Sequence, residues 1–348
     1  MPMGYAIDHD GTVSTLPPAM QIFLLTEGVT IQAALTLAAN LGIADLLAEG
    51  PQTSDWLAQA TSTHPPSLYR VLRLLSSFGV FSEIDPGRFA QTASSDLLRA
   101  GTLDSLRSWV QMTGLLVWPQ TFAAALHSVK TGQPALKHVV GTEFFEYLAT
   151  HPREGTVFSA AMSDFGRGVS QAVVQAYDFS NVGTIVDVGG GHGTLLSAIL
   201  RGNAHLKGIL FDLPHVADGA RGLMASAGIA DRCEIQGGDF FAEVPAGGDV
   251  YILSWIIHDW DRGRAVSILK RCRQAMPTTG RLLLVEAVIP PGNEPHAGKI
   301  MDFVMLTALG GQERTKEQYE DLLQEAGFRL SAVVQTASPM SVIEGRPS

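Results

Sequence analysis

The strongest constraint on the fold is an alternation of short β-rich runs with helical stretches that begins near residue 182. The runs lie at 184–188, 208–211, 250–253 and 282–285. Strands that are separated by helices run parallel in one sheet, and the helices cover both of its faces. Residues 332–335 and 341–343, around Pro339, are close enough to add an antiparallel edge. We therefore predict an α/β domain with a doubly wound, mostly parallel sheet.

The first 170 or so residues are patterned differently, with apolar side chains at helical spacing. Ile31, Ala34, Leu35, Ala38 and Leu41 share one face if their segment is a helix. Runs typical of strands are few in this half, so we expect it to be mainly helical. A chain of 348 residues is long enough for two domains.

A helix-turn-helix followed by a short hairpin is expected within the helical half. Thr53 can cap a first helix, and Thr63, which stands before two prolines, can cap a second one. Residues 80–83 and 88–91 flank an Asp-Pro-Gly sequence at 85–87, which suits a tight reversal between two strands. This arrangement is typical of a winged helix.

The charge balance opposes the DNA binding for which many winged helices are used. Residues 1–100 carry nine acidic side chains against four basic ones, and the whole chain has a net charge of -10. A surface that binds phosphates needs the opposite balance.

The two cysteines lie far apart without metal-ligand neighbours, and no signal peptide or apolar run of membrane-spanning length is present. We expect a soluble, cytoplasmic protein.

A glycine-rich turn follows the first β-rich run and precedes a helix. Glycines stand at 189, 191 and 193, and such a turn lets a ligand approach backbone N–H groups. In the dinucleotide fingerprint a third glycine falls at the place that Thr194 occupies here. The match to a nicotinamide-dependent dehydrogenase is therefore imperfect, although that alternative stays open.

Two carboxylates follow the next strands and complete a pocket for a nucleoside. Asp212 ends the second strand, 19 residues after Gly193, where it can accept hydrogen bonds from a ribose diol. Asp239 follows the third strand and offers an acceptor for an adenine amino group beside the ring of Phe240. Together these residues indicate a site for adenosine without phosphates.

His258 follows the fourth strand, at the sheet edge where ligands bind in doubly wound folds. An imidazole with a pKa near 6.5 can accept a proton at neutral pH, provided that its second ring nitrogen is held by a carboxylate. Glu286 and Glu313 are the candidates for that carboxylate.

Six motifs occur in one order along the chain, and together they carry a family resemblance. They are Val-Asp-Val-Gly-Gly-Gly at 186–191, Phe-Asp-Leu-Pro-His at 211–215, Gly-Gly-Asp-Phe at 237–240, Ile-His-Asp-Trp at 257–260, Val-Glu-Ala-Val-Ile-Pro at 285–290 and Gly-Gly-Gln-Glu-Arg-Thr at 310–315. Through these motifs and their order, the chain resembles the caffeate/acetylserotonin-type small-molecule O-methyltransferases over nearly its whole length.

The resemblance implies both a fold and a domain division. It implies a Rossmann-like S-adenosylmethionine-dependent methyltransferase domain with a seven-stranded, mostly parallel sheet, preceded by a mainly α winged-helix dimerisation domain. The division that follows is residues 1–105 for the dimerisation domain, 106–175 for a helical linker that contributes to the acceptor pocket, and 176–348 for the methyltransferase domain. A homodimer through the N-terminal helices is implied as well, with an apolar face that includes Leu24, Leu37 and Leu41.

The resemblance also implies roles for individual residues. His258 would be the general base, flanked by Glu286 and Glu313. S-adenosylmethionine, which becomes S-adenosylhomocysteine, would be bound by Asp187, Gly189, Gly191, Asp212, Leu213, Asp239, Phe240, Ser254 and Trp260. The acceptor would be lined by Phe158, Met162, Phe165, Met301, Val304 and Met305, each of which is equally compatible with ordinary core.

The expected function is therefore methyl transfer onto a hydroxyl, which we expect to be phenolic, of a small and largely apolar secondary metabolite. No metal is expected, because the spacing of the carboxylates near His258 does not indicate a metal cluster. Two positions depart from plant members, since Ser254 replaces a usual lysine and Leu309 a polar residue. A winged-helix DNA-binding regulator and a cofactor-binding relative with altered chemistry are the alternatives.

Overall fold

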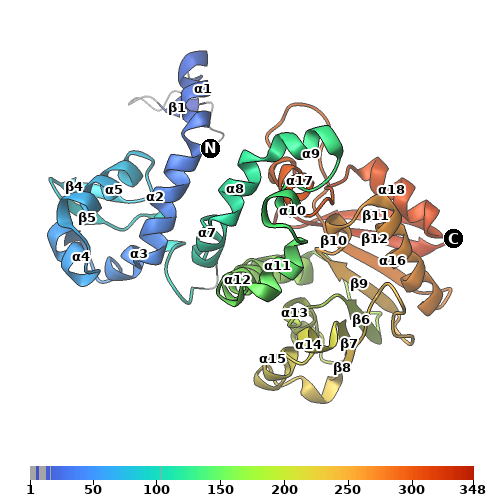
Figure 1. Ribbon diagram of the computed structural model, residues 1–348. Coiled ribbons are helices and arrows are strands. Elements are labelled where there is room, and N and C mark those ends of the chain that lie inside the picture. The colour runs from blue at the N-terminus through green and yellow to red at the C-terminus, as the bar shows by residue number, and fades with distance from the viewer. Residues whose placement is uncertain (1–4, 8–12, 16, 103) are drawn as a thin grey trace. The chain divides into compact units, whose positions relative to one another are not determined.

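The computed structural model describes residues 5–7, 13–15, 17–102 and 104–348, which form two compact units (Figure 1). The first unit comprises Met1–Pro119 and Leu148–Phe165, and the second comprises Gln120–Tyr147 and Gly166–Ser348. The division falls inside three helices, which are α8 Val117–Ala123, α11 Phe144–Thr150 and α12 Pro152–Ala176. Each unit is described by itself below.

The first unit is mainly helical, as its apolar spacing predicts. Its other elements, in chain order, are β1 Tyr5–Ile7, β2 Val13–Thr15, α1 Pro18–Thr26, α2 Gly28–Asn40, α3 Ile43–Leu46, β3 Gln52–Thr53, α4 Ser54–Ala60, α5 Pro65–Ser77, β4 Ser82–Asp85, β5 Arg88–Ala90, α6 Ala93–Asp96 and α7 Arg107–Thr113.

The winged helix is present, with α4 and α5 beside a three-stranded sheet in the order β3-β5-β4. Thr53 caps α4 by accepting a hydrogen bond from the amide of Trp56 at 3.2 Å. The predicted cap of α5 is wrong by one residue, because the N-cap position is His64 and it makes no side-chain cap bond. The Thr63 hydroxyl bonds to Thr61 instead, at 2.9 Å.

The core of the winged helix follows from the amphipathic pattern of α5. Leu68, Leu72 and Leu75 recur on one face and are buried together with Phe81 and Phe89. Removing each such side chain from water contributes about 1.5–3 kcal/mol to folding. The first unit therefore has an apolar core of its own.

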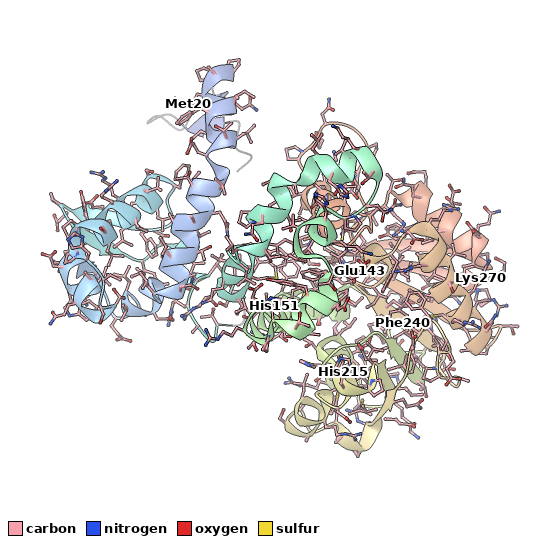
Figure 2. All side chains as sticks on the ribbon, viewed as in Figure 1. Met20, Glu143, His151, His215, Phe240 and Lys270 are labelled. Atoms are coloured by element: carbon pink, nitrogen blue, oxygen red, sulfur yellow. The ribbon has the colours of Figure 1, made fainter. Side chains whose placement is uncertain are left out.

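The two N-terminal helices expose several apolar side chains, although α2 also buries the three alanines Ala34, Ala38 and Ala39. α1 has no buried residue, and Met20, on this helix in Figure 2, is 47% exposed. Of the predicted apolar face, Leu37 is exposed while Leu24 and Leu41 are half-buried. Among the described helices none alone is long and apolar enough to cross a membrane, although α1 and α2, bent by 47°, meet that criterion together in length and composition only.

The second unit contains the alternating elements. In chain order they are α9 Ala125–Thr131, α10 Ala135–Val140, β6 Thr184–Val188, α13 Thr194–Gly202, β7 Lys207–Asp212, α14 Pro214–Ala217, α15 Ala220–Ser226, η1 Ala230–Arg232, β8 Cys233–Gly237, β9 Val250–Ser254, η2 Ile257–Asp259, α16 Arg262–Ala275, β10 Arg281–Glu286, α17 Ala297–Ala308, α18 Lys316–Glu325, β11 Phe328–Gln335 and β12 Ser341–Pro347.

These strands form one seven-stranded sheet in the order β11-β12-β10-β9-β6-β7-β8, which confirms the predicted fold class (Figure 1). β12 is antiparallel to both of its neighbours, whereas the pairs from β10 to β8 are all parallel. The chain moves from β6 outward to β8 and then returns to β9 on the other side of β6. This reversal creates a switch point, where ligands bind beyond the carboxyl ends of the strands.

The central strands are buried on both faces because helices cover the sheet on each side. Val186 in β6, Leu253 in β9 and Leu284 in β10 are fully buried. On one face they pack with Ile268 of α16 and Leu322 of α18 in a continuous apolar cluster. A rigid sheet of this kind fixes the loops at its carboxyl edge.

Candidate active site

The glycine-rich turn connects β6 to α13 in a conformation that suits glycine. Gly189, Gly191 and Gly193 have φ values of 72°, 58° and 83°, which side chains with a Cβ rarely adopt. A Cβ at Gly189 would lie 2.6 Å from the Ile256 side chain and 3.5 Å from the Phe240 ring. The turn thus lies directly against residues that follow β8 and β9.

The amides of the four glycines in this turn are bonded within the protein, so these four are not available to a ligand. Gly189 and Gly190 donate to the Phe211 carbonyl at 2.8 and 3.3 Å. Gly193 donates to the Gly190 carbonyl at 2.9 Å. Gly191 donates to Asp212 Oδ2 at 2.7 Å. The turn therefore differs from a phosphate-binding loop, whose amides point at the ligand.

Two carboxylates lie under and beside the turn. Asp212, at the end of β7, accepts the Gly191 amide at Oδ2 and the Leu213 amide at Oδ1, at 2.7 Å each. Asp187 in β6 is 1% exposed, and its Oδ2 has no hydrogen-bond partner. Burial, reinforced by the charge of Asp212, raises the pKa of Asp187 to about 7. A buried, incompletely bonded carboxylate of this kind favours a donor or a cation as a ligand.

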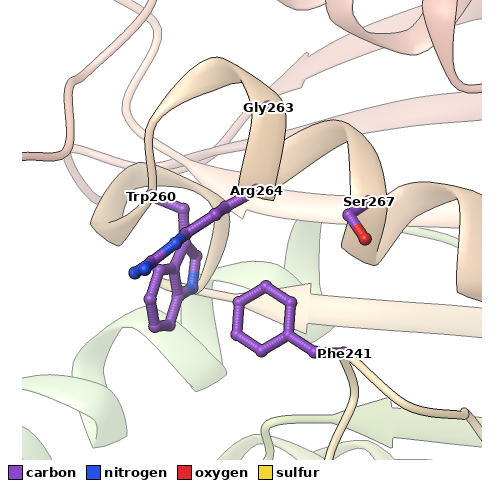
Figure 3. A pocket seen from close by; sticks show the side chains of 5 residues that line it. All are labelled: Phe241, Trp260, Gly263, Arg264 and Ser267. Carbon is purple, nitrogen blue, oxygen red and sulfur yellow. The ribbon is translucent and has the colours of Figure 1, made fainter.

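Aromatic rings gather beside the loop that follows β8. Phe240, labelled in Figure 2, meets Phe241 and Trp260 edge to face, with ring centroids 5.0 and 6.2 Å apart. The Arg264 guanidinium lies over the Trp260 ring at 5.4 Å from its centroid (Figure 3). With Gly263 and Ser267 added, Phe241, Trp260 and Arg264 line a cavity of about 400 Å³. Asp239 is exposed, and its Oδ1 accepts the Phe241 amide at 2.9 Å.

His258 lies in η2, directly beyond the carboxyl end of β9, and is 6% exposed. Its Nδ1 is 2.7 Å from Oε1 of Glu313, which is buried in the segment before α18. Glu286 ends β10, and its Oε2 lies 4.0 Å from the same Nδ1. The structure therefore brings together the three residues that the sequence analysis proposes as the base and its flanking carboxylates.

Glu286 also holds the backbone on which His258 stands. Its Oε1 accepts the amides of Ile256 and Ile257 at 3.2 and 2.8 Å. Trp255, one residue earlier, has a φ of 58°, which is a strained conformation for a bulky side chain. The strain is maintained by bonds such as these on the residues that follow it.

The charges around His258 change its protonation behaviour and that of its neighbours. Burial opposes protonation of the imidazole, but the charges of Asp259, Glu286 and Glu313 outweigh it and raise the pKa of His258 to about 10. Burial raises the pKa of Glu286 to about 7 and that of Asp259 to about 6. His258 must therefore release a proton before it can act as a base.

Asp259 is a site residue that the sequence analysis misses. Its Oδ1 lies 3.3 Å from His258 Nε2, the ring nitrogen opposite Glu313. Adjacent residues seldom face each other in a helix or strand, and the tight turn of η2 is what allows this contact. Neither spacing nor periodicity in the sequence gives a signal for it.

The donor atoms of His258, Glu286 and Glu313 lie within 4.8 Å of one another, which is compatible with metal ligation. The spacing argument against a metal cluster therefore does not hold in three dimensions. The 2.7 Å contact between His258 and Glu313 is nevertheless a hydrogen-bond distance, and a shared proton uses the lone pair that a metal would need.

The residues expected to line the acceptor fall into both units. Phe158, Met162 and Phe165 lie in the part of α12 that belongs to the first unit, where the Phe165 ring is 5.1 Å from that of Trp109. Met301, Val304 and Met305 lie in α17 of the second unit. Val304 lines an apolar cavity of about 370 Å³ together with Phe122, Ile300 and Phe303.

We expect Glu313→Gln to lower the pKa of the His258 imidazole. The amide keeps an acceptor for Nδ1–H but removes a negative charge, so the titration should move by about 1–3 pH units toward lower pH. An NMR titration of the histidine side chains measures this, and the His258 signal is identified by its loss in His258→Gln. Glu325→Gln, an exposed position in the same unit, is the control. An identical His258 titration in both variants would contradict the prediction.

Two family models match the chain. The model of the O-methyltransferase domain matches residues 122–329, and that of the O-methyltransferase dimerisation domain matches residues 23–101. The first match alone spans more than half of the chain and includes the strands from β6 to β10, His258 and both glutamates.

The chain is also similar to characterised proteins over nearly its whole length. It is 47% identical to phenazine O-methyltransferase PhzM of Lysobacter antibioticus, over 97% of this chain and 99% of the relative. The solved structure of LaPhzM has a TM-score of 0.89 at 47% identity, covering 96% of this chain and 100% of that one. The S-adenosylhomocysteine-bound structure of CalO1, a methyltransferase in calicheamicin biosynthesis, has a TM-score of 0.87 at 37% identity, covering 95% and 98%.

One relative is named for a hydroxylation and not for methyl transfer. Aclacinomycin 10-hydroxylase RdmB of Streptomyces purpurascens is 35% identical over 86% of this chain and 81% of its own length.

The matched domains, the 47% identity to a phenazine O-methyltransferase and the shared fold agree with each other and with the site described above. The chain is an enzyme of the O-methyltransferase family.

Proposed function

We propose that the enzyme transfers a methyl group from S-adenosylmethionine to a hydroxyl, most readily a phenolic one, of a small aromatic secondary metabolite. The observation that carries the proposal is the buried His258–Glu313 pair at the carboxyl edge of the sheet, beside a turn whose four glycine amides are bonded within the protein. We further propose that the chain is of the caffeate/acetylserotonin type within its family, which the six ordered motifs support.

The residues at the switch point fit this cofactor better than a dinucleotide. A dinucleotide needs free turn amides for its pyrophosphate, whereas here the amides of Gly189, Gly190, Gly191 and Gly193 are bonded internally. Asp212 keeps lone pairs that can accept ribose hydroxyls, and the unpartnered Asp187 Oδ2 suits an ammonium group at the methionine end.

The remaining cofactor contacts are proposed from the places of their residues at or near the carboxyl ends of the strands. Leu213 is exposed beside Asp212, and Asp239 with Phe240 offers an acceptor and a ring face for adenine. The adenine side of the pocket would also include half-buried Ser254, the last residue of β9, and half-buried Trp260, which follows η2. S-adenosylhomocysteine bound to CalO1 supports the choice of this cofactor.

The chemistry assigned to the protein is proton removal and positioning. When bound, the cofactor supplies an electrophilic methyl group. A phenol with a pKa near 10 is mostly protonated at neutral pH, so its proton must leave as the oxygen attacks. His258 Nε2 would take that proton, while Glu313 holds Nδ1–H and fixes the orientation of the ring. Turnover should accordingly increase as pH rises and His258 becomes neutral.

The proposed acceptor is flat and largely apolar. Met301, Val304 and Met305 of α17, with Phe158, Met162 and Phe165 of α12, offer thioether and ring surfaces for such a molecule. The name of the phenazine-modifying relative supports an aromatic acceptor. Transfer of a labelled methyl group to a panel of phenols, polyketides and hydroxyindoles would identify it.

The proposed assembly is a homodimer through the N-terminal helices. The matched dimerisation domain at residues 23–101 supports this, as do the exposed apolar side chains of α1 and α2. The division at residues 1–105, 106–175 and 176–348 and the cytoplasmic location stay predictions.

The alternatives are less well supported. The hydroxylase name of RdmB keeps altered chemistry open within the family, but His258 and both glutamates are present here. A DNA-binding regulator is opposed by the acidic balance of the winged helix. A dehydrogenase is opposed by the internally bonded turn, and a thermal-shift comparison of S-adenosylhomocysteine with NAD would separate the two cofactors.

His258→Ala is expected to reduce turnover by about 10²–10⁴-fold, the usual contribution of a general base. Affinity for S-adenosylhomocysteine, measured by calorimetry, should stay nearly unchanged because the imidazole is not assigned to cofactor binding. The exposed His205, replaced by alanine, is the matched control. Full turnover in His258→Ala would show that the acceptor ionises without this base.

Asp212→Asn should weaken the binding of S-adenosylhomocysteine by about 10–100-fold. A hydrogen bond to a charged group contributes about 1.5–3 kcal/mol, and each 1.4 kcal/mol is about tenfold in affinity. Calorimetry compares this variant with Asp218→Asn, an exposed carboxylate beyond α14. Equal affinities in the two variants would argue against the assigned nucleoside site.

A chelator should leave turnover unchanged, because the His258–Glu313 contact is that of a hydrogen bond. The measurement is methyl transfer before and after treatment with EDTA. Loss of activity that added Mg²⁺ or Zn²⁺ restores would instead assign His258, Glu286 and Glu313 to a metal.

A further inference from the structure

Arg314 is a fully buried arginine whose guanidinium donates to three backbone carbonyls. It is 1% exposed and follows Glu313 directly. Nη1 donates to the Ile257 carbonyl at 2.9 Å and to the Gln312 carbonyl at 3.2 Å, and Nη2 donates to the Trp260 carbonyl at 2.9 Å. A planar guanidinium spans several fixed acceptors with donors on separate nitrogens, whereas a lysine ammonium carries its three donors on a single atom.

These carbonyls belong to the two segments that carry the catalytic pair of the proposed function. Ile257 precedes His258, and Gln312 precedes Glu313, so one guanidinium nitrogen is bonded to the residue before each partner. The Gln312 amide also donates to the His258 carbonyl at 2.9 Å. The contact is so close that a Cβ at Gly311 would lie 2.0 Å from that carbonyl oxygen.

The loop that Arg314 holds would otherwise relax. Trp255 adopts a φ of 58° two residues before Ile257, and a bulky residue keeps such a conformation only where the surroundings enforce it. Glu286 fixes the amides of Ile256 and Ile257 from one side. Arg314 fixes the carbonyls of Ile257 and Trp260 from the other.

We propose that Arg314 is a positioning residue for methyl transfer, which sets the His258–Glu313 geometry by clamping both segments to one guanidinium. This inference rests on the proposed role of His258 as the base. Arg314 does not touch the acceptor or the cofactor in this proposal. Its effect reaches the reaction only through the direction in which the imidazole points and through the proton shared with Glu313.

Arg232 provides a matched control within the same unit. Its Nη1 donates to the carbonyls of Asn203 and Leu206 at 3.2 and 2.9 Å, and its Nη2 donates to that of Leu200 at 3.0 Å. It thus makes the same set of three backbone bonds, but between α13 and β7 and away from His258. Arg232→Met therefore measures the effect of losing an arginine whose role is purely structural.

The experiment compares Arg314→Met and Arg314→Lys with Arg232→Met in the full-length enzyme. Arg314→Met should lower kcat by about 10–100-fold, the cost of a misplacement near 1 Å, while the affinity for S-adenosylhomocysteine stays within about twofold. Without any ligand, its His258 NMR titration should shift from that of the wild type, because the bond to Glu313 is loosened and a positive charge beside the cluster is removed. Arg314→Lys should give an intermediate result. Arg232→Met should change the melting temperature but neither kcat nor the His258 titration.

Three outcomes would overturn the inference. The first is a His258 titration in Arg314→Met that matches the wild type. The second is a loss of kcat in Arg232→Met as large as that in Arg314→Met. The third is unfolding of both Arg314 variants while Arg232→Met stays folded, which would make the role structural. If His258→Ala retains full turnover, the proposed function itself fails, and that result is distinct from these three.

Discussion

The hydrogen bond between His258 and Glu313 is the interaction around which the residues of the candidate active site are arranged, and the proposed chemistry depends on it. It joins residues 55 positions apart and lies in a site where both side chains are buried. Burying charged groups is costly unless they are paired. The pair meets this condition in part, since Oε2 of Glu286 and of Glu313 has no hydrogen-bond partner. The backbone around His258 is held by Glu286 and Arg314, and the Gln312 amide donates to the His258 carbonyl. The sheet supplies the rigid edge from which these segments extend.

The glycine turn illustrates how one backbone shape can serve different ligands. A strand, a turn with glycines in the left-handed region and a helix also make up a phosphate-binding loop. Here the next strand takes up the turn amides through the Phe211 carbonyl and the Asp212 carboxylate. The four glycine amides are therefore not available to a ligand, whereas carboxylates and ring faces lie close by, and this difference in chemistry agrees with the proposed adenosine that carries no phosphate.

Much of the fold and part of the site could be predicted from the sequence. The alternation of runs predicts the parallel sheet, and the order of the motifs brings Asp212, His258 and Glu313 to one edge. Other features depend on tertiary contacts and have no local signal. They include the Asp259 contact with His258, the strained Trp255 and the internal bonding of the turn amides. The cap at Thr63 is wrong because the hydroxyl finds another partner in Thr61.

The crowding of His258, Asp259, Glu286 and Glu313 in one buried volume has a thermodynamic consequence. Groups this close exchange protons as a set, so their ionisation belongs to the cluster and not to single residues. A ligand that brings a positive charge toward the cluster expels a proton into solution, and an uncharged analogue of the same shape does not. The heat of binding then varies with the ionisation enthalpy of the buffer for the first ligand only, so calorimetry in several buffers reports the charge that a ligand brings to this site.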